Sequence, residues 1–319
     1  MMAGIWIFAE NREQTLELIN AGWNLADELG VNLVAFALTE QLAQEYIKYG
    51  TDEVLLLPPL TQEQPLESYV PVIVEAARNA DPDVFFIGAT KRGKEMATRI
   101  AASLNTGLAT ECNAFALDQE KKLLVMERMI YGGKAVQKVV CTTRPQMATI
   151  PARTFELAPL QEAKEGKIIR LTAAPPSPVK IINRNSKVQE AVDITEAKII
   201  VSVGRGVEKK EDIALAQELA SILGGTVGCS RPIAEELHWL PEEVYMGISG
   251  KKVKPDLYIG LGVSGQIQHI TGIRDSKIIL AINRDENAPI FDAADYGIVG
   301  DLYDVVPNLI KAFSNVLKI

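Results

Sequence analysis

The chain has 319 residues, of which 47% are hydrophobic and 23% charged, and it carries a formal net charge of -8. This length is about twice that of a usual domain, so we expect two domains with separate cores. The acidic charge argues against nucleic acid or anionic lipid as a partner, because both would repel it. No apolar run is long enough for a membrane helix or resembles a signal peptide. We therefore expect a cytoplasmic protein without membrane insertion.

The cysteines and histidines argue against a metal centre. Cys112, Cys141 and Cys229 are far apart in the sequence and form no C-x-x-C pair, which disfavours disulfides, zinc and iron-sulfur clusters. We expect buried free thiols in a reducing compartment. The chain contains two histidines, His238 and His269, so a histidine-based metal site is also disfavoured.

The first half alternates strands with amphipathic helices, which is typical of a mostly parallel sheet covered by helices. Strands are predicted at 4–9, 31–38, 54–57 and 83–88, and helices at 13–29, 69–79 and 94–104. Beyond Gly107 strand follows strand, at 109–116, 123–130, 134–141 and 147–150, which indicates an antiparallel addition to the same domain. A last strand is expected at 179–182. The N-terminal domain is therefore predicted to be Rossmann-like α/β with added antiparallel strands.

Clustered prolines at 173–178 are typical of a linker, and we place the domain boundary and a hinge near 187–193. The predicted domains are thus 1–188 and 189–319. After the boundary, strands at 198–203, 226–229, 257–261 and 277–282 alternate with helices at 211–223 and 305–317. This pattern predicts a C-terminal doubly wound parallel sheet.

The strongest local motif is a G-x-G-x-x-G turn from Gly260 to Gly265, between a predicted strand and the start of a helix. Glycines allow a tight turn and a close approach of the backbone to a pyrophosphate, which the helix N-terminus attracts. The motif therefore favours a dinucleotide. The alternative at this point is a glycine-rich turn without a ligand.

Two arginines follow other strands of the same domain. Arg205 lies in a Gly-Arg-Gly turn and Arg231 follows Ser230, both at carboxyl strand ends, where α/β domains bind ligands. Such a pair suits phosphates or a redox group that becomes anionic, although either arginine alone could be a solvated surface charge. His269, just after the glycine turn, is either a neutral donor to the ligand or a structural residue.

Other charged clusters have simpler interpretations. We interpret the carboxylates Glu235 and Glu236 as solvated surface. The basic run at 91–94 follows a strand and could contact an anion, but a solvated helix start is the simpler interpretation. No serine, histidine and acid combination for a hydrolase is present, since Ser264 misses the G-x-S-x-G frame by one residue.

The segment LYIGLGVSGQIQH at 257–269, followed by AIN at 281–283, resembles the signature of electron-transfer flavoprotein alpha subunits. Flanking segments agree with this resemblance, and together they span 201–307. They are VSVGRG at 201–206, CSRP at 229–232, MGISGK at 246–251, APIF at 288–291 and ADYGIVGD at 294–301. The segments at 229–232 and 295–301 are most similar to the FixB-like branch.

This resemblance implies a C-terminal domain that binds FAD and a heterodimer with an electron-transfer flavoprotein beta subunit. The residue matching Arg231 would lie by the isoalloxazine, the hydroxyl matching Ser249 would reach toward the ring, and the imidazole matching His269 would face flavin O2. Such donors stabilise negative charge on a reduced flavin. The implied FAD-binding residues are Arg205, Ser230, Arg231, Met246, Gly247, Ile248, Ser249, Gly250, Ser264, Gly265, Gln266, Ile267, Gln268, His269, Asn283, Asp301 and Leu302.

Three positions depart from the family pattern. Gly260 replaces a small Ala or Thr, Ser249 replaces Thr with its hydroxyl retained, and Ile248 replaces Gln with the loss of a polar contact. The ligand is expected to be the same, and the change at Ile248 bears on the flavin potential.

The resemblance predicts an electron carrier, not an enzyme with a diffusible substrate, working between an acyl-CoA dehydrogenase or reductase and another redox partner. Any ferredoxin would be a separate partner, because no cysteine-rich segment is present. Two alternatives stay open. One is an NAD-dependent dehydrogenase using the 260–265 turn, with Asp285 as ribose ligand. The other is a flavin-free structural subunit.

Overall fold

The computed structural model describes residues 4–161, 164–171, 178–184 and 193–317. The chain separates into two compact units, Met1–Asn185 and Ser186–Ile319. The predicted proline linker at 173–178 and the predicted hinge at 187–193 lie outside the described residues, except for Pro178 and Asp193.

The N-terminal unit is built on a parallel sheet with the strand order β10-β3-β2-β1-β4-β9-β5. Its strands are β1 Gly4–Phe8, β2 Asn32–Ala37, β3 Glu53–Leu56, β4 Val84–Gly88, β5 Leu108–Ala109, β9 Gln146–Ile150 and β10 Lys167–Arg170. Its helices are α1 Arg12–Leu29, α2 Glu40–Lys48, α3 Val70–Ala80 and α4 Lys91–Leu104, with a 3-10 turn η1 at Leu66–Tyr69.

Both faces of this sheet are buried, so its central strands are apolar throughout instead of alternating. In β1, Ile5 and Ile7 join the core formed with α1 and α2, whereas Trp6 and Phe8 join the core formed with α3 and α4. Because successive side chains of a strand point to opposite faces, one strand contributes to both cores. The predicted helix-covered parallel sheet is confirmed.

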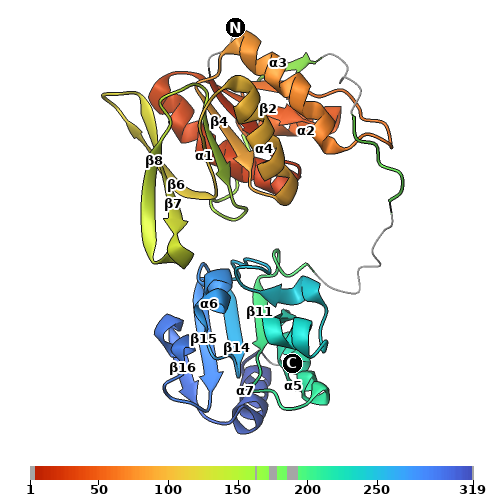
Figure 1. Ribbon diagram of the computed structural model, residues 1–319, viewed down its shortest axis with the longest axis vertical. Coiled ribbons are helices and arrows are strands. Elements are labelled where there is room, and N and C mark those ends of the chain that lie inside the picture. The colour runs from red at the N-terminus through yellow and green to blue at the C-terminus, as the bar shows by residue number, and fades with distance from the viewer. Residues whose placement is uncertain (1–3, 162–163, 172–177, 185–192, 318–319) are drawn as a thin grey trace. The chain divides into compact units, whose positions relative to one another are not determined.

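The antiparallel addition is smaller than predicted. Strands β6 Cys112–Asp118, β7 Leu123–Ile130 and β8 Ala135–Val140 form a separate antiparallel sheet, and β7 and β8 are joined by the 3-10 turn η2 Tyr131–Gly133 (Figure 1). The strand predicted at 109–116 is split, because Glu111 takes a positive φ of 54° that ends the pairing of β5. The strand predicted at 147–150 is β9, which pairs in parallel with β4 and β5 in the main sheet.

A second correction concerns the edge of the sheet. The strand predicted at 179–182 is not formed, and β10 occupies the edge position beside β3. Helix α2 was not predicted from the sequence.

The C-terminal unit contains a parallel sheet with the strand order β13-β12-β11-β14-β15-β16. Its strands are β11 Ile199–Val203, β12 Thr226–Ser230, β13 Tyr245–Met246, β14 Leu257–Leu261, β15 Ile278–Asn283 and β16 Tyr296–Val299. Its helices are α5 Ile213–Leu223, α6 Ile267–Ile273 and α7 Leu302–Leu317. Short turns are η3 Lys210–Asp212, η5 Glu242–Val244 and η6 Pro289–Ala293, which are 3-10, and η4 Pro232–Glu236, which is a π turn.

The strand order of this unit reverses between β11 and β14. After β11 the chain passes to β12 and β13 on one side, and from β14 it passes to β15 and β16 on the other. In doubly wound domains the loops diverge at such a reversal and leave a crevice outside the carboxyl ends of the two strands, where ligands bind. The predicted doubly wound sheet is confirmed, and its reversal lies beside the glycine turn.

Candidate functional site

The candidate FAD-binding residues come from the carboxyl ends of all six strands of the C-terminal sheet. Because these strands are parallel, their ends share one edge, as predicted for the loops after β11, β12 and β14. Arg205 follows β11, and Ser230 ends β12 with Arg231 directly after it. Met246 ends β13 and is followed by the candidate residues up to Gly250, while Ser264 to His269 follow β14. Asn283 ends β15, and Asp301 with Leu302 follow β16.

The loops after β11 and β14 are pressed together at the reversal. The amide of Gly204 donates to the Leu261 carbonyl at 2.9 Å, and that of Gly206 donates to the Gly262 carbonyl at 3.0 Å. A Cβ at Gly262 would lie 2.6 Å from the Cα of Gly206, and its φ of 60° is in the left-handed region. The second glycine of the G-x-G-x-x-G motif is therefore required by loop packing.

The last glycine of the motif also has a structural cause. Gly265 has a φ of 81°, and a Cβ there would overlap the backbone of Ile290 in η6. The Ile290 amide donates to the Ser264 carbonyl at 3.1 Å, and the Asn283 side-chain amide donates to the Val263 carbonyl at 2.9 Å. The sequence explained these glycines by approach to a pyrophosphate, whereas the structure shows that contacts between loops already require them.

The loop after β13 packs on α6. The amide of Ile248 donates to the Gln268 carbonyl at 2.8 Å, and Gly272 of α6 leaves room for the backbone of Gly247. The hydroxyl of Tyr245 donates to the Ser249 carbonyl at 2.9 Å. These contacts hold Ser249 and Ile248 with exposed side chains at the same edge as the glycine turn.

Arg231 lies where β12 runs into the π turn η4, a type of turn that is frequent at functional sites. Its Nε donates to Oε2 of Glu235 at 2.5 Å, and the side chain of Arg231 is 64% exposed. The hydrogen bond from Arg231 lowers the pKa of the Glu235 carboxyl, and Glu235 raises the pKa of the guanidinium. Glu235, interpreted from the sequence as a solvated carboxylate, is thus the ion-pair partner of Arg231.

His269 is buried in the first turn of α6, with 7% of its surface exposed. Its Nε2 lies 2.8 Å from the hydroxyl of the buried Tyr258. Burial lowers the pKa of His269 to about 4, and the backbone of Met246 acts in the opposite direction. His269 is therefore neutral at pH 7, and its Nδ1 makes no hydrogen bond of good geometry to the described residues.

The residues implied for the adenosine end have structural contacts of their own. The Asn283 side chain donates to the Val263 carbonyl and accepts from the amide of Asp285 at 3.0 Å. The Asp301 carboxylate accepts from the amide of Tyr303 at 2.9 Å and so caps α7, and Leu302 is buried. These three residues shape the edge, and their side chains are largely engaged within the protein.

Two residues of this site were missed by the sequence analysis. Tyr258 lies in β14, where it was counted as an ordinary strand residue, and Glu235 was counted as surface. A spacing of four residues between Arg231 and Glu235 was the available signal for an ion pair on a helical turn. No local signal indicated the pairing of Tyr258 with His269, because it depends on how α6 returns to the sheet.

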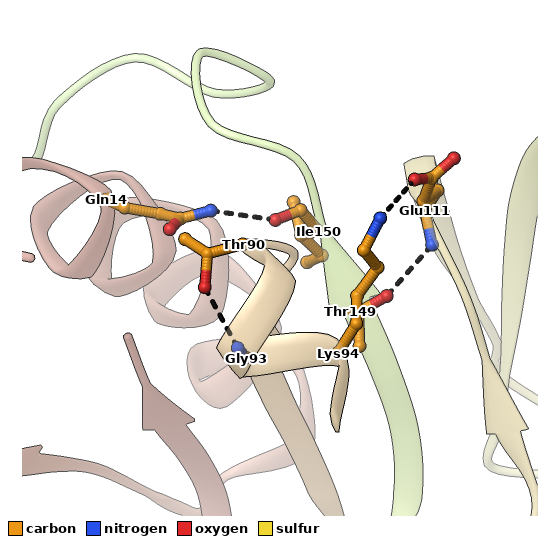
Figure 2. A network of polar contacts seen from close by, with 7 residues as sticks. All are labelled: Gln14, Thr90, Gly93, Lys94, Glu111, Thr149 and Ile150. Atoms are coloured by element: carbon orange, nitrogen blue, oxygen red, sulfur yellow. Dashed lines mark hydrogen bonds and ion pairs between the residues drawn. The ribbon is translucent and has the colours of Figure 1, made fainter. Parts of the chain in front are cut away.

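At the corresponding edge of the N-terminal unit, residues near the ends of β4, β5 and β9 form a network of internal contacts (Figure 2). The Lys94 ammonium pairs with Glu111 at 2.9 Å, the Thr90 hydroxyl accepts from the amide of Gly93 at 2.9 Å, and the Thr149 hydroxyl accepts from the Glu111 amide at 2.9 Å. The basic run at 91–94 therefore begins a capped helix with an internal ion pair, which agrees with the simpler interpretation.

The three cysteines are buried free thiols, as predicted, and burial raises the pKa of Cys112 to about 11 and that of Cys229 to about 12. Among the described residues, no group of three His, Cys, Asp or Glu side chains is placed to hold a metal ion. Within the same residues no helix has both the length and the apolar character needed to cross a membrane.

The edge of the C-terminal sheet fits a flavin nucleotide. Ser264 and residues 266–268 are exposed beside the reversal, and Arg205 and Arg231 supply positive charge at the ends of β11 and β12. Among the residues that the structure describes, the buried Nδ1 of His269 has no hydrogen-bond partner of good geometry, and a buried polar atom normally has one. The fold and the edge together define a nucleotide-binding doubly wound domain with donors suited to an anionic redox group.

Comparison with known proteins gives the family. Residues 5–176 match the family model "Electron transfer flavoprotein domain", and residues 193–274 match "Electron transfer flavoprotein FAD-binding domain". The chain belongs to the electron transfer flavoprotein alpha subunit family, and its cofactor is FAD. This agrees with the resemblance seen in the sequence.

Several relatives match along nearly their whole length. The electron transfer flavoprotein subunit alpha of Clostridium acetobutylicum is 40% identical, over 98% of this chain and 98% of its own. Protein FixB of Clostridium saccharobutylicum is 40% identical, over 99% of this chain and 97% of its own. The acryloyl-CoA reductase electron transfer subunit beta of Anaerotignum propionicum is 36% identical, over 97% of this chain and 95% of its own.

Proposed function

We propose that this chain is the FAD-carrying subunit of a heterodimer with an electron-transfer flavoprotein beta subunit. In this proposal the complex passes electrons between an acyl-CoA dehydrogenase or reductase and a second redox partner. The acyl-CoA link is supported by the relative that is named as an electron transfer subunit of acryloyl-CoA reductase. A cytoplasmic location is part of the proposal and is supported by the acidic charge and the free buried thiols.

The observation that carries the proposal is the convergence of all six strand-end loops of the C-terminal sheet at one edge. Beside them lies a buried imidazole nitrogen of His269 that has no hydrogen-bond partner among the described residues. We assign Ser264 to Gln268, with Gly247 and Ile248, to the pyrophosphate and ribityl chain. Asn283, Asp301 and Leu302 are assigned to the adenosine end. Arg205, Ser230, Met246 and Gly250 complete the edge.

FAD supplies one- and two-electron redox chemistry when it is bound. The guanidinium of Arg231 supplies positive charge that favours an anionic, reduced ring. Ser249 offers a hydroxyl on an exposed loop, and His269 offers a neutral ring whose second nitrogen needs a hydrogen-bond partner. The role of these residues is therefore to bind the cofactor and set its potential.

The rival function is an NAD-dependent dehydrogenase. Its proposed ribose ligand, Asp285, lies two residues beyond β15, but its carboxylate accepts from the amide of Asn287 at 3.0 Å. The match of residues 193–274 to an FAD-binding domain further favours flavin.

The test is an absorption spectrum of the chain co-expressed with its beta subunit, recorded during stepwise reduction. We expect a flavin band that bleaches on reduction and changes in Arg231→Ala. A colourless complex that saturably binds NADH would replace the proposal with the dehydrogenase, and a colourless complex that binds neither would indicate a structural subunit. Reduction of a ferredoxin by added NADH that occurs only when a second, higher-potential acceptor takes the other electron would extend the proposal to a bifurcating complex.

A further inference from the structure

A buried hydrogen bond joins the strand before the glycine turn to the helix after it. The Tyr258 hydroxyl in β14 lies 2.8 Å from Nε2 of His269 in α6, and their ring centroids are 6.1 Å apart. Tyr258 is fully buried and His269 is 7% exposed. Burial disfavours the charged form of both groups, raising the pKa of Tyr258 and lowering that of His269. The pair is therefore a neutral phenol and a neutral imidazole.

A single proton lies between these two atoms, and two arrangements are open. Either the phenol donates to a bare Nε2, or a protonated Nε2 donates to the phenol oxygen. In the first arrangement the proton of the imidazole is on Nδ1. In the second it is on Nε2, and Nδ1 is a bare acceptor.

The surroundings of Tyr258 decide between them. If Nε2 carried the proton, the phenol proton of Tyr258 would need another buried acceptor, and leaving a buried donor unsatisfied is costly. Ser202 Oγ is close enough to lower the pKa of Tyr258, but it makes no hydrogen bond of good geometry to the described residues. Among the described residues, the hydrogen bond of good geometry made by the Tyr258 hydroxyl is the one with Nε2 of His269 at 2.8 Å, so the phenol donates its proton to that nitrogen.

We propose that Tyr258 is a positioning residue that holds His269 as the neutral Nδ1–H tautomer, so that the ring presents one N–H donor to bound FAD. The part concerning FAD rests on the proposed placement of His269 against the cofactor, whereas the tautomer is a property of the chain itself. A bare Nδ1 would repel the electron-rich carbonyl oxygen of a flavin, so the direction of one buried hydrogen bond decides whether His269 assists or opposes the reduced ring.

The tautomer is measurable by 15N NMR of the full chain, labelled at histidine, both with FAD and after its removal. The chain has two histidines, so His238→Gln assigns the signals of His269. We expect a pyrrole-type shift for Nδ1 and a pyridine-type shift for Nε2 in both samples. A protonated Nε2 in the FAD-free chain would overturn the proposal without bearing on flavin binding.

Tyr258→Phe removes the hydroxyl and keeps the ring. We expect the His269 signals to move toward a mixture of tautomers, and the midpoint potential of bound FAD to fall. Tyr303→Phe is the matched control, because its hydroxyl also makes hydrogen bonds in the same unit, to Asp212 and the Glu208 amide, and it should change neither signal.

The two parts fail separately. If the wild-type tautomer is as expected but the Nδ1 shift is the same with and without FAD, His269 does not donate to the cofactor and that part of the proposal is wrong. If Tyr258→Phe does not fold, the wild-type spectra alone still decide the tautomer.

Discussion

The Nε atom of Arg231 lies 2.5 Å from the Oε2 atom of Glu235. The positive charge of the guanidinium at the end of β12 is therefore partly neutralised by a carboxylate four residues further along the chain. Glu235→Gln keeps the size of the side chain and removes this charge. On the proposed site we expect the midpoint potential of bound FAD to rise by on the order of 10 mV, since exposed pairs are screened by solvent.

The control for this variant is Glu236→Gln, which removes the same charge from the neighbouring residue. Spectroelectrochemical titration measures the midpoint potential of bound FAD in both variant complexes. We expect a smaller change of this potential for Glu236→Gln than for Glu235→Gln. Arg231→Ala should shift the potential downward. If the wild type and the three variants all had the same midpoint potential, Arg231 would not act on the flavin.

The buried His269 makes the stability of the C-terminal unit depend on pH. Its pKa is about 4 in the folded chain and about 6.5 when unfolded, so the unfolded chain binds the proton first as the pH falls. The contribution of His269 to the free energy of unfolding is therefore fully present above about pH 6.5. It is lost as the pH falls toward 4, by up to about 3 kcal/mol.

Denaturant unfolding of the FAD-free chain at pH 7 and pH 5 measures this loss. His269→Gln should reduce the difference between the two values, whereas the exposed His238→Gln should retain it. Acidic residues titrate equally in all three proteins, so their contribution cancels in the comparison. An unchanged difference in His269→Gln would contradict the buried neutral imidazole.

The close packing of the two loops predicts a large effect at Gly262. Gly262→Ala combines a positive φ with a Cβ 2.6 Å from Gly206, and should destabilise the unit by about 3 kcal/mol or more. Gly224→Ala has a similar φ of 66° but open space around its Cβ, and should cost about 1 kcal/mol. Thermal unfolding without FAD compares the two, and equal costs would show that the loops separate easily.

In the N-terminal unit, Thr90 caps α4 through its hydroxyl, which accepts from the Gly93 amide (Figure 2). Thr90→Ala should cost about 1 kcal/mol. The matched control is Thr98→Ala in the same helix, whose hydroxyl donates to the Lys94 carbonyl and which should change stability by less than about 0.5 kcal/mol. Chemical unfolding followed by helical circular dichroism distinguishes the two variants.

Much of the fold could be predicted because its signals are local. Helix periodicity, capping residues and apolar runs are set by neighbours in the chain, and they indicated both parallel sheets. The errors arose where pairing is distant. The strand at 147–150 is apolar enough for either kind of sheet, and β10 offers a short apolar run that becomes a strand through its pairing with β3.

The sequence by itself determined the family, the cofactor and the strand-end segments that carry the candidate site, because family signatures and strand-turn-helix patterns are written in consecutive residues. Only the tertiary structure decided that Gly262 and Gly265 are required by contacts between loops, and that Tyr258 bonds His269. Close approach, the choice of a rotamer and the direction of a buried hydrogen bond depend on atoms that distant segments bring together, and local pattern carries no information about them.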